Sequence, residues 1–223
     1  MNRQEDIGKH TNYLIHTIPS RVWYVTEYLI PSMLLQGIDR RDITVYNDLK
    51  GQGNLLAFVN SSRKLTRGTW HIQDDVIIAS NFKEVTEKMQ GSNVVCGFCS
   101  DYSENEPAGE VASPNMWYSF PCIYIPYSIM QEFLRWLDID ALRNDKYRNW
   151  INAGKFDDSL FMEFMKSEHL GGPVINLKPN LVDHVDFLLG GSTLNKQRTK
   201  SARSIYWDEP ELINKLSIQL SGR

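Results

Sequence analysis

Two adjacent acidic residues, Asp74 and Asp75, stand between the apolar segments 70–72 and 76–78. Neighbouring carboxylates raise each other's pKa unless a cation or solvent relieves the repulsion. Mg²⁺ and Mn²⁺ relieve it well, because these hard cations take oxygen ligands and leave room for phosphate oxygens. At the end of an apolar strand, the pair therefore predicts a divalent-metal site. The alternative is a turn or helix cap with two solvated aspartates, since aspartate is common in turns.

The elements that must position this pair follow from short apolar and amphipathic segments. Strands are expected at 12–18, 43–46 and 70–73, with helices at 21–35 and 55–65 between them. A proline inside the first helix, Pro31, should break or kink it, because proline has no backbone N–H to donate. Strands that alternate with helices favour an α/β fold with a mainly parallel sheet, flanked by helices. Such sheets bind ligands at the carboxyl ends of their strands, which is where the acidic pair stands.

The second half of the chain continues the same pattern. Strands are expected at 94–98 and 174–177, and an edge or bent strand at 117–127, which contains two prolines. Asn81 and Ser128 each begin a pattern typical of a capping box, and each should open a helix. We therefore expect one α/β domain over residues 1–195, followed by a basic tail or lid over 196–223.

The order and spacing of these elements resemble the GT-A-fold glycosyltransferases over residues 12–194, which is most of the chain. Gln73-Asp74-Asp75 is similar to the metal-binding Asp-x-Asp element of that fold, in its Glu/Gln-Asp-Asp variant. The resemblance is closest to small glycosyltransferase-like proteins of tailed phages, in which a WH-x-QDD segment precedes a VVCGF-like strand. It implies a single Rossmann-like domain and a nucleotide-sugar donor, most simply a uridine diphosphate sugar.

The resemblance also implies where the donor binds. Residues 15–21 are similar to the fold's first strand and nucleotide loop, and Asn47 with Asp48 stands where the second strand meets the donor's base. Arginine forks suit phosphate, although exposed arginines on helices are often ordinary surface residues. The donor-binding residues implied in this way are Thr17, Pro19, Ser20, Arg21, Asn47, Asp48, Arg63, Gln73 and Asp74.

A metal and a base complete the site that the resemblance implies. Mn²⁺ or Mg²⁺ would be held by Asp75, with Asp74 nearby and His184 as a third ligand, because the segment Pro-x-Leu-x-x-His resembles a late metal-binding segment of several GT-A families. Asp158, or its neighbour Asp157, opens a helix and would remove the acceptor's proton if the reaction inverts. The alternatives are a surface histidine and an ordinary pair of helix-capping aspartates.

The acceptor is the least defined partner. Trp117 and Tyr118 could stack on a sugar or a base, or they could simply pack in the core. Phage enzymes of this kind include ones that glycosylate 5-hydroxymethylpyrimidines in DNA, and such an enzyme must flip the base or bind a single strand. A net charge of −3 speaks against a DNA-binding face, since such faces are usually basic. A cell-surface polysaccharide or lipopolysaccharide precursor is the rival acceptor. A nucleotidyltransferase is a further alternative, but residues 18–21 lack the expected glycine-rich loop.

The composition sets broad limits on these functions. The 223 residues are 42% hydrophobic and 23% charged, which is close to the average for globular proteins. No apolar run reaches the roughly 18 residues that a membrane span needs, and the polar start does not resemble a signal peptide. We therefore expect a cytoplasmic protein without a membrane partner.

The three cysteines predict no disulfide framework, and we expect Cys96 and Cys99 in the core. The basic tail could close over a pyrophosphate, follow a nucleic-acid backbone, or only be solvated.

Overall fold

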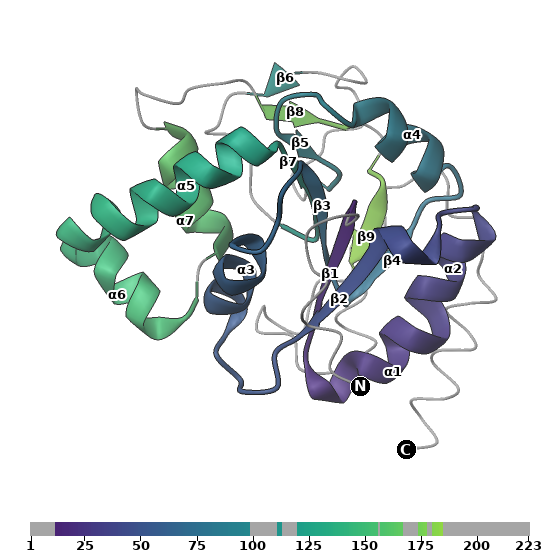
Figure 1. Ribbon diagram of the computed structural model, residues 1–223, viewed down its shortest axis with the longest axis horizontal. Coiled ribbons are helices and arrows are strands. Elements are labelled where there is room, and N and C mark those ends of the chain that lie inside the picture. The colour runs from purple at the N-terminus through teal and green to yellow at the C-terminus, as the bar shows by residue number, and fades with distance from the viewer. Residues whose placement is uncertain are drawn as a thin grey trace.

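A seven-stranded sheet forms the centre of the structure, with the strand order β2-β1-β3-β7-β5-β8-β6 (Figure 1). This computed structural model describes residues 12–98, 111–112, 120–155, 157–166, 174–177 and 180–184. The strands of the large sheet are β1 Tyr13–Thr17, β2 Ile43–Asn47, β3 Thr69–Gln73, β5 Val95–Cys96, β6 Val111–Ala112, β7 Cys122–Ile125 and β8 Val174–Asn176.

Three parallel strands make up the half of the sheet that carries the predicted metal-binding pair. The strand β1 lies between β2 and β3 and pairs with both in parallel, as the alternation of strands and helices predicts. In register, Thr17 lies opposite Asn47, and His16 lies opposite Gln73. The carboxyl ends of the three strands therefore meet at one edge of the sheet.

The sheet as a whole is mixed, so the prediction of a mainly parallel sheet is corrected. The strand β7 runs antiparallel to both β3 and β5, and β6 runs antiparallel to β8. Of these pairs, only β5 and β7 have no described helix between them in sequence, and strands without a crossover helix readily pair antiparallel. The two prolines of the 117–127 segment lie just outside β7, which is an interior strand and not an edge. There, the carbonyl of Pro121 accepts a hydrogen bond from the N–H of Gln73 at 2.9 Å.

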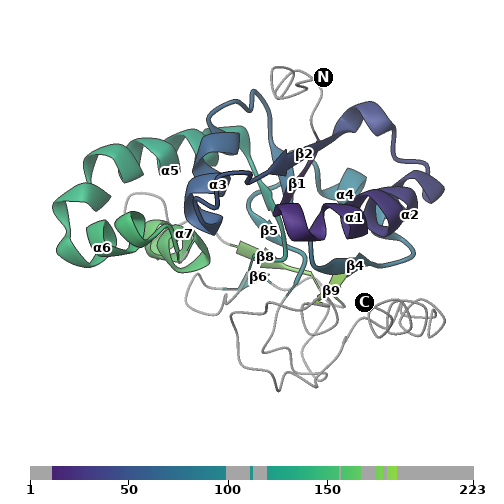
Figure 2. The same ribbon diagram turned by 90° about the horizontal axis from the view of Figure 1, so that it is seen from below.

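Helices cover both faces of the sheet, which Figures 1 and 2 show from two directions. On one face lie the helices α1, α2 and α4, and on the other lie α3, α5, α6 and α7. Side chains alternate along each strand: Trp70 and Ile72 of β3 pack with the first group, whereas His71 between them contacts Phe58 of α3. The helices are α1 Val22–Tyr24, α2 Ile30–Leu35, α3 Asn54–Ser62, α4 Phe82–Met89, α5 Tyr127–Ile139, α6 Asp145–Ala153 and α7 Asp157–Lys166.

The predicted break at Pro31 takes the form of a wider helical turn. Between α1 and α2 the backbone forms a π-helical turn over Val25–Leu29, and Pro31 lies in the first turn of α2. Since proline cannot donate to the preceding turn, a π turn is one way in which a helix absorbs the missing hydrogen bond. The helical segment continues through the proline, so that both halves pack on the sheet.

A second, two-stranded sheet was not foreseen. The strand β4 Val76–Ile78 pairs antiparallel with β9 Val182–His184, with Val76 opposite His184 in register. Each strand has only three residues, and more than a hundred residues separate them in the sequence. The pairing brings the end of the described chain alongside the segment that follows the acidic pair.

Two predicted helix caps are wrong in detail. Asn81 stands at the N-cap of α4, but its side chain makes no capping hydrogen bond. Ser128 lies inside the first turn of α5, because the helix already begins at Tyr127, after Pro126. Cys96 is buried, as expected, and Cys99 lies outside the described residues. In the part of the chain that the structure describes, no helix has the length and apolar character needed to cross a membrane.

Candidate functional site

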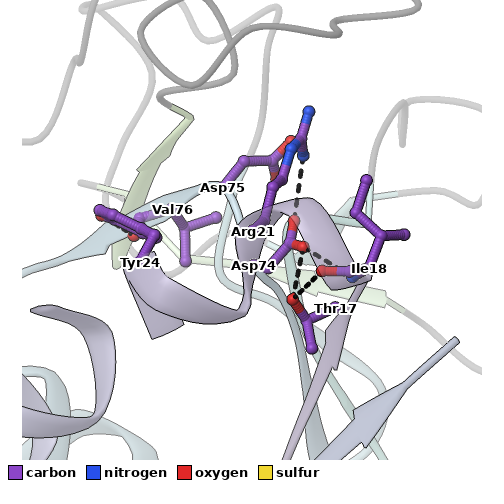
Figure 3. A network of polar contacts seen from close by, with 7 residues as sticks. All are labelled: Thr17, Ile18, Arg21, Tyr24, Asp74, Asp75 and Val76. Carbon is purple, nitrogen blue, oxygen red and sulfur yellow. Dashed lines mark hydrogen bonds and ion pairs between the residues drawn. The ribbon is translucent and has the colours of Figure 1, made fainter. Parts of the chain in front are cut away.

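Polar side chains gather where β1 and β3 end (Figure 3). The chain leaves β1 at Thr17 and turns through the short 3-10 segment Pro19–Arg21, while β3 ends at Gln73 and passes directly into Asp74 and Asp75. Neighbouring parallel strands bring their carboxyl ends together, so these two connections must meet. The structure thus places the predicted nucleotide loop against the predicted metal-binding pair.

Asp74 is held at this junction by three groups from the connection after β1. Its Oδ2 accepts hydrogen bonds from the Thr17 hydroxyl at 2.8 Å and from the Ile18 N–H at 3.2 Å. Its Oδ1 accepts a charged hydrogen bond from Nη1 of Arg21 at 3.0 Å. Asp74 is only 5% exposed, so these contacts replace the water that an ionised carboxylate would otherwise bind.

Asp75 shares the same guanidinium. Nη1 of Arg21 lies 2.7 Å from Oδ2 of Asp75, so one nitrogen bridges the two carboxylates. Burial raises the pKa of Asp74, and the charge of Asp75 raises it further, while Arg21 opposes both effects. Two carboxylates and one guanidinium carry a net charge of −1, which leaves this buried edge favourable for further positive charge.

The backbone beside Asp75 is fixed by a tyrosine that the sequence did not single out. The Tyr24 hydroxyl donates to the carbonyl of Val76 at 2.8 Å, and the Tyr24 side chain is almost fully buried (Figure 3). This bond ties α1 to the first residue of β4 and therefore restrains the direction in which Asp75 leaves the sheet. Only its long-range partner identifies Tyr24, so no local pattern could have revealed it.

The connection after β2 adds a buried acceptor. The Asp48 N–H donates to the carbonyl of Thr17 at 2.8 Å, and Oδ2 of Asp48 accepts from the N–H of Gly53 at 3.1 Å. Oδ1 of Asp48 is buried and finds no hydrogen-bond donor among the described residues, and the same is true of Oδ1 of Asn47. A ligand with N–H or O–H groups could satisfy such acceptors, because an unmet buried acceptor is costly.

A crossing of two loops connects this region to the start of α7. Gly53 and Gly154 both have positive φ angles, and the carbonyl of Gly154 accepts from the N–H of Leu55 at 3.2 Å. A Cβ on Gly154 would collide with the carbonyl oxygen of Gln52, and one on Gly53 with the carbonyl of Gly154. The close backbone approach requires glycine at both places. Through this contact, the loop after β2 touches Gly154, which precedes Asp157 by three residues in the sequence.

The two aspartates that begin α7 are partly buried. Burial raises the pKa of Asp157 to about 7, and the neighbouring Asp158 adds to the effect. Burial also raises the pKa of Asp158, although hydrogen bonds from Ser159 oppose this. The backbone N–H of Ser159 donates to Oδ1 of Asp158 at 2.6 Å. The inward face of α7 is as the sequence predicts, with Leu160, Phe161, Phe164 and Met165 buried.

The other predicted site residues fall into three groups. Pro19 and Ser20 lie in the turn that carries Arg21, and Gln73 ends β3, so all three belong to the edge described above. Arg63 is elsewhere: it pairs with Asp138 at 2.6 Å on an exposed part of the surface, between α3 and α5. His184 is placed by its backbone opposite Val76, next to Asp75, but its side chain lies outside the described part. Trp117 and Tyr118 also lie outside the described residues.

The oxygen atoms at the acidic pair fit a hard divalent cation in kind. One cationic nitrogen already lies within 3.0 Å of an oxygen from each carboxylate, so the space between Asp74 and Asp75 accepts positive charge. No cluster of three or more histidine, cysteine or acidic side chains that could hold a metal occurs among the described residues. Among the described side chains, a metal would therefore take two ligands, Asp74 and Asp75, and water, phosphate oxygens or His184 would complete its coordination.

Neither comparison with known proteins identifies the chain: no family model matches it, and no curated protein matches it. The function must therefore be argued from the geometry of this site.

Proposed function

We propose that the protein is a metal-dependent GT-A-type glycosyltransferase, which moves a sugar from a nucleotide-diphosphate sugar to an acceptor hydroxyl. The observation that carries this proposal is the meeting of Asp74, Asp75 and Arg21 at the carboxyl ends of β1 and β3. This combination offers oxygen ligands for a cation and a guanidinium for phosphate at one place. The buried acceptors of Asn47 and Asp48 lie on the neighbouring connection, where a nucleoside would need hydrogen-bond partners.

Each residue has a distinct task in the proposed reaction. Thr17 and the N–H of Ile18 orient Asp74, and the bond from Tyr24 restrains the chain beside Asp75. Asp48 would accept a hydrogen bond from the donor's base or ribose, and Arg21 would bind the diphosphate. Asp75, with Asp74 and His184, would hold Mn²⁺ or Mg²⁺, and that cation would neutralise the diphosphate as it leaves.

The start of α7 supports an acid–base role. Asp157 or Asp158 would accept the proton of the attacking hydroxyl in an inverting reaction, and the raised pKa values suit a group that must take up a proton near neutral pH. The crossing of Gly53 and Gly154 gives a reason for these aspartates to lie beside the donor loop.

We further propose 5-hydroxymethylpyrimidine in DNA as the acceptor, on the resemblance to phage enzymes. The basic tail and the aromatic pair that favour this acceptor lie outside the described residues. Incubation of the protein with labelled donor and hydroxymethylated DNA, followed by digestion to nucleosides, tests it. A mass increase on the modified nucleoside is expected. Its absence, with transfer to a polysaccharide or lipopolysaccharide precursor instead, would overturn the DNA acceptor but not the glycosyltransferase.

The reaction class has its own test. A panel of nucleotide sugars is incubated with and without Mn²⁺, and released nucleoside diphosphate is measured. We expect metal-dependent release from one donor, and a loss of at least about 100-fold in Asp75→Asn, as when one electrostatic contact to developing charge is removed. Asp138→Asn, in the exposed pair with Arg63, is the matched control and should keep full activity. Release that is equally fast in EDTA, or in Asp75→Asn, would contradict the proposal.

A further inference from the structure

Two histidines from neighbouring strands are hydrogen-bonded to each other on the α3 face of the sheet. Nε2 of His16 in β1 lies 3.2 Å from Nδ1 of His71 in β3, and the two rings are nearly parallel, at 15°. Both rings contact Phe58 of α3, which itself packs among three further phenylalanines. The proposed metal site and the proposed base use neither histidine, so the pair needs an explanation of its own.

Each histidine leaves one ring nitrogen without a hydrogen-bond partner. Nδ1 of His16 and Nε2 of His71 are buried, and neither finds a partner among the described residues. Burial lowers the pKa of His16 to about 4 and that of His71 well below its ordinary value, so both rings are neutral at neutral pH. A neutral imidazole has one N–H and one bare nitrogen. The hydrogen bond between the rings therefore allows two arrangements, and in each of them one outer nitrogen is a donor and the other an acceptor.

The surroundings of the pair favour one of these two arrangements. The end at His71 is closed, because this residue is only 3% exposed and its ring lies against that of Phe58, with 4.9 Å between the centroids. An unmet N–H is rarer inside proteins than an unmet acceptor, so the bare nitrogen belongs at the closed end. His71 then has its proton on Nδ1 and donates to Nε2 of His16, which leaves the proton of His16 on Nδ1. The pair thus presents an N–H at the His16 end.

The His16 end lies beside the proposed donor site. His16 is partly exposed and precedes Thr17, whose carbonyl accepts from the Asp48 N–H at 2.8 Å. Both side chains lie against α3: Asp48 accepts from Gly53, the N-cap of that helix, and His16 contacts Phe58. Asp48 is 4% exposed, and its Oδ1 finds no donor in the described part of the chain. This corner of the sheet therefore holds both an unmet N–H and an unmet carboxylate oxygen, which a ligand with an acceptor and a donor would satisfy.

We propose that His16 determines specificity in the donor site by donating a hydrogen bond from its Nδ1–H to an acceptor oxygen of the nucleoside, and that His71 is the positioning residue that holds His16 in this tautomer. This inference rests on the proposed function, because the nucleoside is that of the donor. Asp48 accepts an N–H or O–H of the same nucleoside. The acceptor oxygen belongs to the base or to the ribose, and the experiment separates these two sources.

Nitrogen NMR of the full wild-type chain with labelled histidine tests the tautomers directly, because protonated and bare imidazole nitrogens have widely separated shifts. At neutral pH, we expect protonated Nδ1 and bare Nε2 in both His16 and His71. Uridine diphosphate with Mg²⁺ should move the Nδ1 proton signal of His16 downfield, as a new hydrogen bond does. Ribose 5-phosphate should cause the same change if the oxygen is on the ribose, and no change if it is on the base.

Two variants of His16 separate the hydrogen bond from the shape of the site. His16→Asn keeps an amide N–H near the place of Nδ1, whereas His16→Gln puts its amide near the place of Nε2. We expect His16→Asn to bind uridine diphosphate about as well as wild type. The affinity of His16→Gln should fall about 3- to 10-fold, as when one hydrogen bond is lost.

Two variants of His71 test its positioning role. His71→Asn keeps an N–H that can donate to Nε2 of His16, so both the tautomer and the nucleotide affinity should stay as in wild type. His71→Leu keeps a side chain of similar bulk without a donor. In this variant the nitrogen shifts of His16 should move toward a mixture of tautomers, which the loss of a purely structural contact would not cause.

The outcomes distinguish this inference from the proposed function. A proton on Nε2 of His16 in wild type, or His16 signals that do not respond while uridine diphosphate binds, would overturn the role of the pair and leave the glycosyltransferase standing. Equal nucleotide affinity in wild type and His16→Gln would do the same. No binding of uridine diphosphate or of the other common nucleoside diphosphates by wild type would overturn both proposals. The wild-type spectra decide the question even if a variant does not fold.

Discussion

Asp157 and Asp158 are neighbours in sequence, yet their surroundings differ. The backbone N–H and hydroxyl of Ser159 both donate to Oδ1 of Asp158, which favours its ionised form. Burial raises the pKa of Asp157 to about 7, and the charge of Asp158 contributes to that shift. A general base works best when its pKa lies near the working pH. The family resemblance favours Asp158 as the base, whereas the pKa of about 7 suits Asp157 to that task.

This difference predicts a specific pH dependence. Activity should rise with pH through about 7, because Asp157 must be deprotonated to accept the acceptor's proton. Asp157→Asn should lower kcat/KM by about 10²- to 10⁴-fold. In Asp158→Asn the rising limb should move to lower pH, because the like charge that raises the pKa of Asp157 is gone. Steady-state rates of nucleoside diphosphate release between about pH 5 and 9 measure all three.

The control for these variants is Asp145→Asn. Asp145 also begins a helix, α6, but its side chain is 84% exposed, and the change should leave the pH profile as in wild type. A full loss in Asp158→Asn, with Asp157→Asn close to wild type, would assign the base to Asp158 instead.

The site residues differ in how far the sequence could reveal them. Asp74 and Asp75 could be predicted because two carboxylates at the end of an apolar strand are conspicuous in one dimension. The bridging position of Arg21 could not, because it depends on where two connections meet, 53 residues apart in sequence. Arg63 shows the converse, since its type suits phosphate but its place just after α3 pairs it with Asp138 on the surface. The type of a residue can be read from the sequence, whereas the residue that it contacts is set by the fold.

At the scale of elements, the crossing of the loops after β2 and before α7 connects the proposed donor side of the site with the proposed base. Gly154→Ala would place a Cβ against the carbonyl oxygen of Gln52, at a residue with φ of +64°. We expect a loss of about 1–2 kcal/mol from the left-handed backbone alone, with the collision adding to it. Because the displaced loop holds Asp48, affinity for uridine diphosphate should also fall. Urea unfolding and nucleotide titration measure the two effects.

Gly51→Ala separates the strain of a left-handed backbone from the loss of the loop crossing at Gly154. Gly51 lies in the same loop with φ of +60°, but a Cβ there would meet nothing within 4 Å. This variant should show the backbone penalty and keep its nucleotide affinity. Equal losses of stability and affinity in the two variants would mean that the crossing does not position the loop.

The elements of the first half could be predicted because each has a local cause. The short apolar segments of β1, β2 and β3, with helices between them, indicate a parallel arrangement without knowledge of distant partners. The pairing of β4 with β9 and the reversed direction of β7 have no such signal. A strand of three residues has too few positions to show a period, and its partner is chosen by the packing of the whole chain. These are also the elements that bring residue 184 beside Asp75.

At the scale of the whole molecule, some ionisable groups have pKa values shifted in opposite directions, so their effects on stability oppose each other as the pH falls. His16 and His71 stack beside Phe58, and Nε2 of His16 lies 3.2 Å from Nδ1 of His71. Burial lowers the pKa of His16 to about 4 and that of His71 well below its ordinary value, where the nearby His16 adds to the effect. Asp157 is shifted the other way. As the pH falls, the buried histidines therefore lower the free energy of unfolding of the protein, while Asp157 raises it.

The signs predict how single variants tilt this balance. The unfolded chain protonates His16 near pH 6.5 and the folded chain only near 4, so wild type loses about 3 kcal/mol at this residue as the pH falls between those values. Folded Asp157 takes up its proton near pH 7 and the unfolded residue near 3.8, which returns about 4 kcal/mol over a similar range. Urea unfolding at about pH 8 and pH 4.5 should thus show His16→Gln gaining stability in acid relative to wild type, and Asp157→Asn losing it. If the stability of wild type, His16→Gln and Asp157→Asn changed equally between the two pH values, neither His16 nor Asp157 would have the shifted pKa given above.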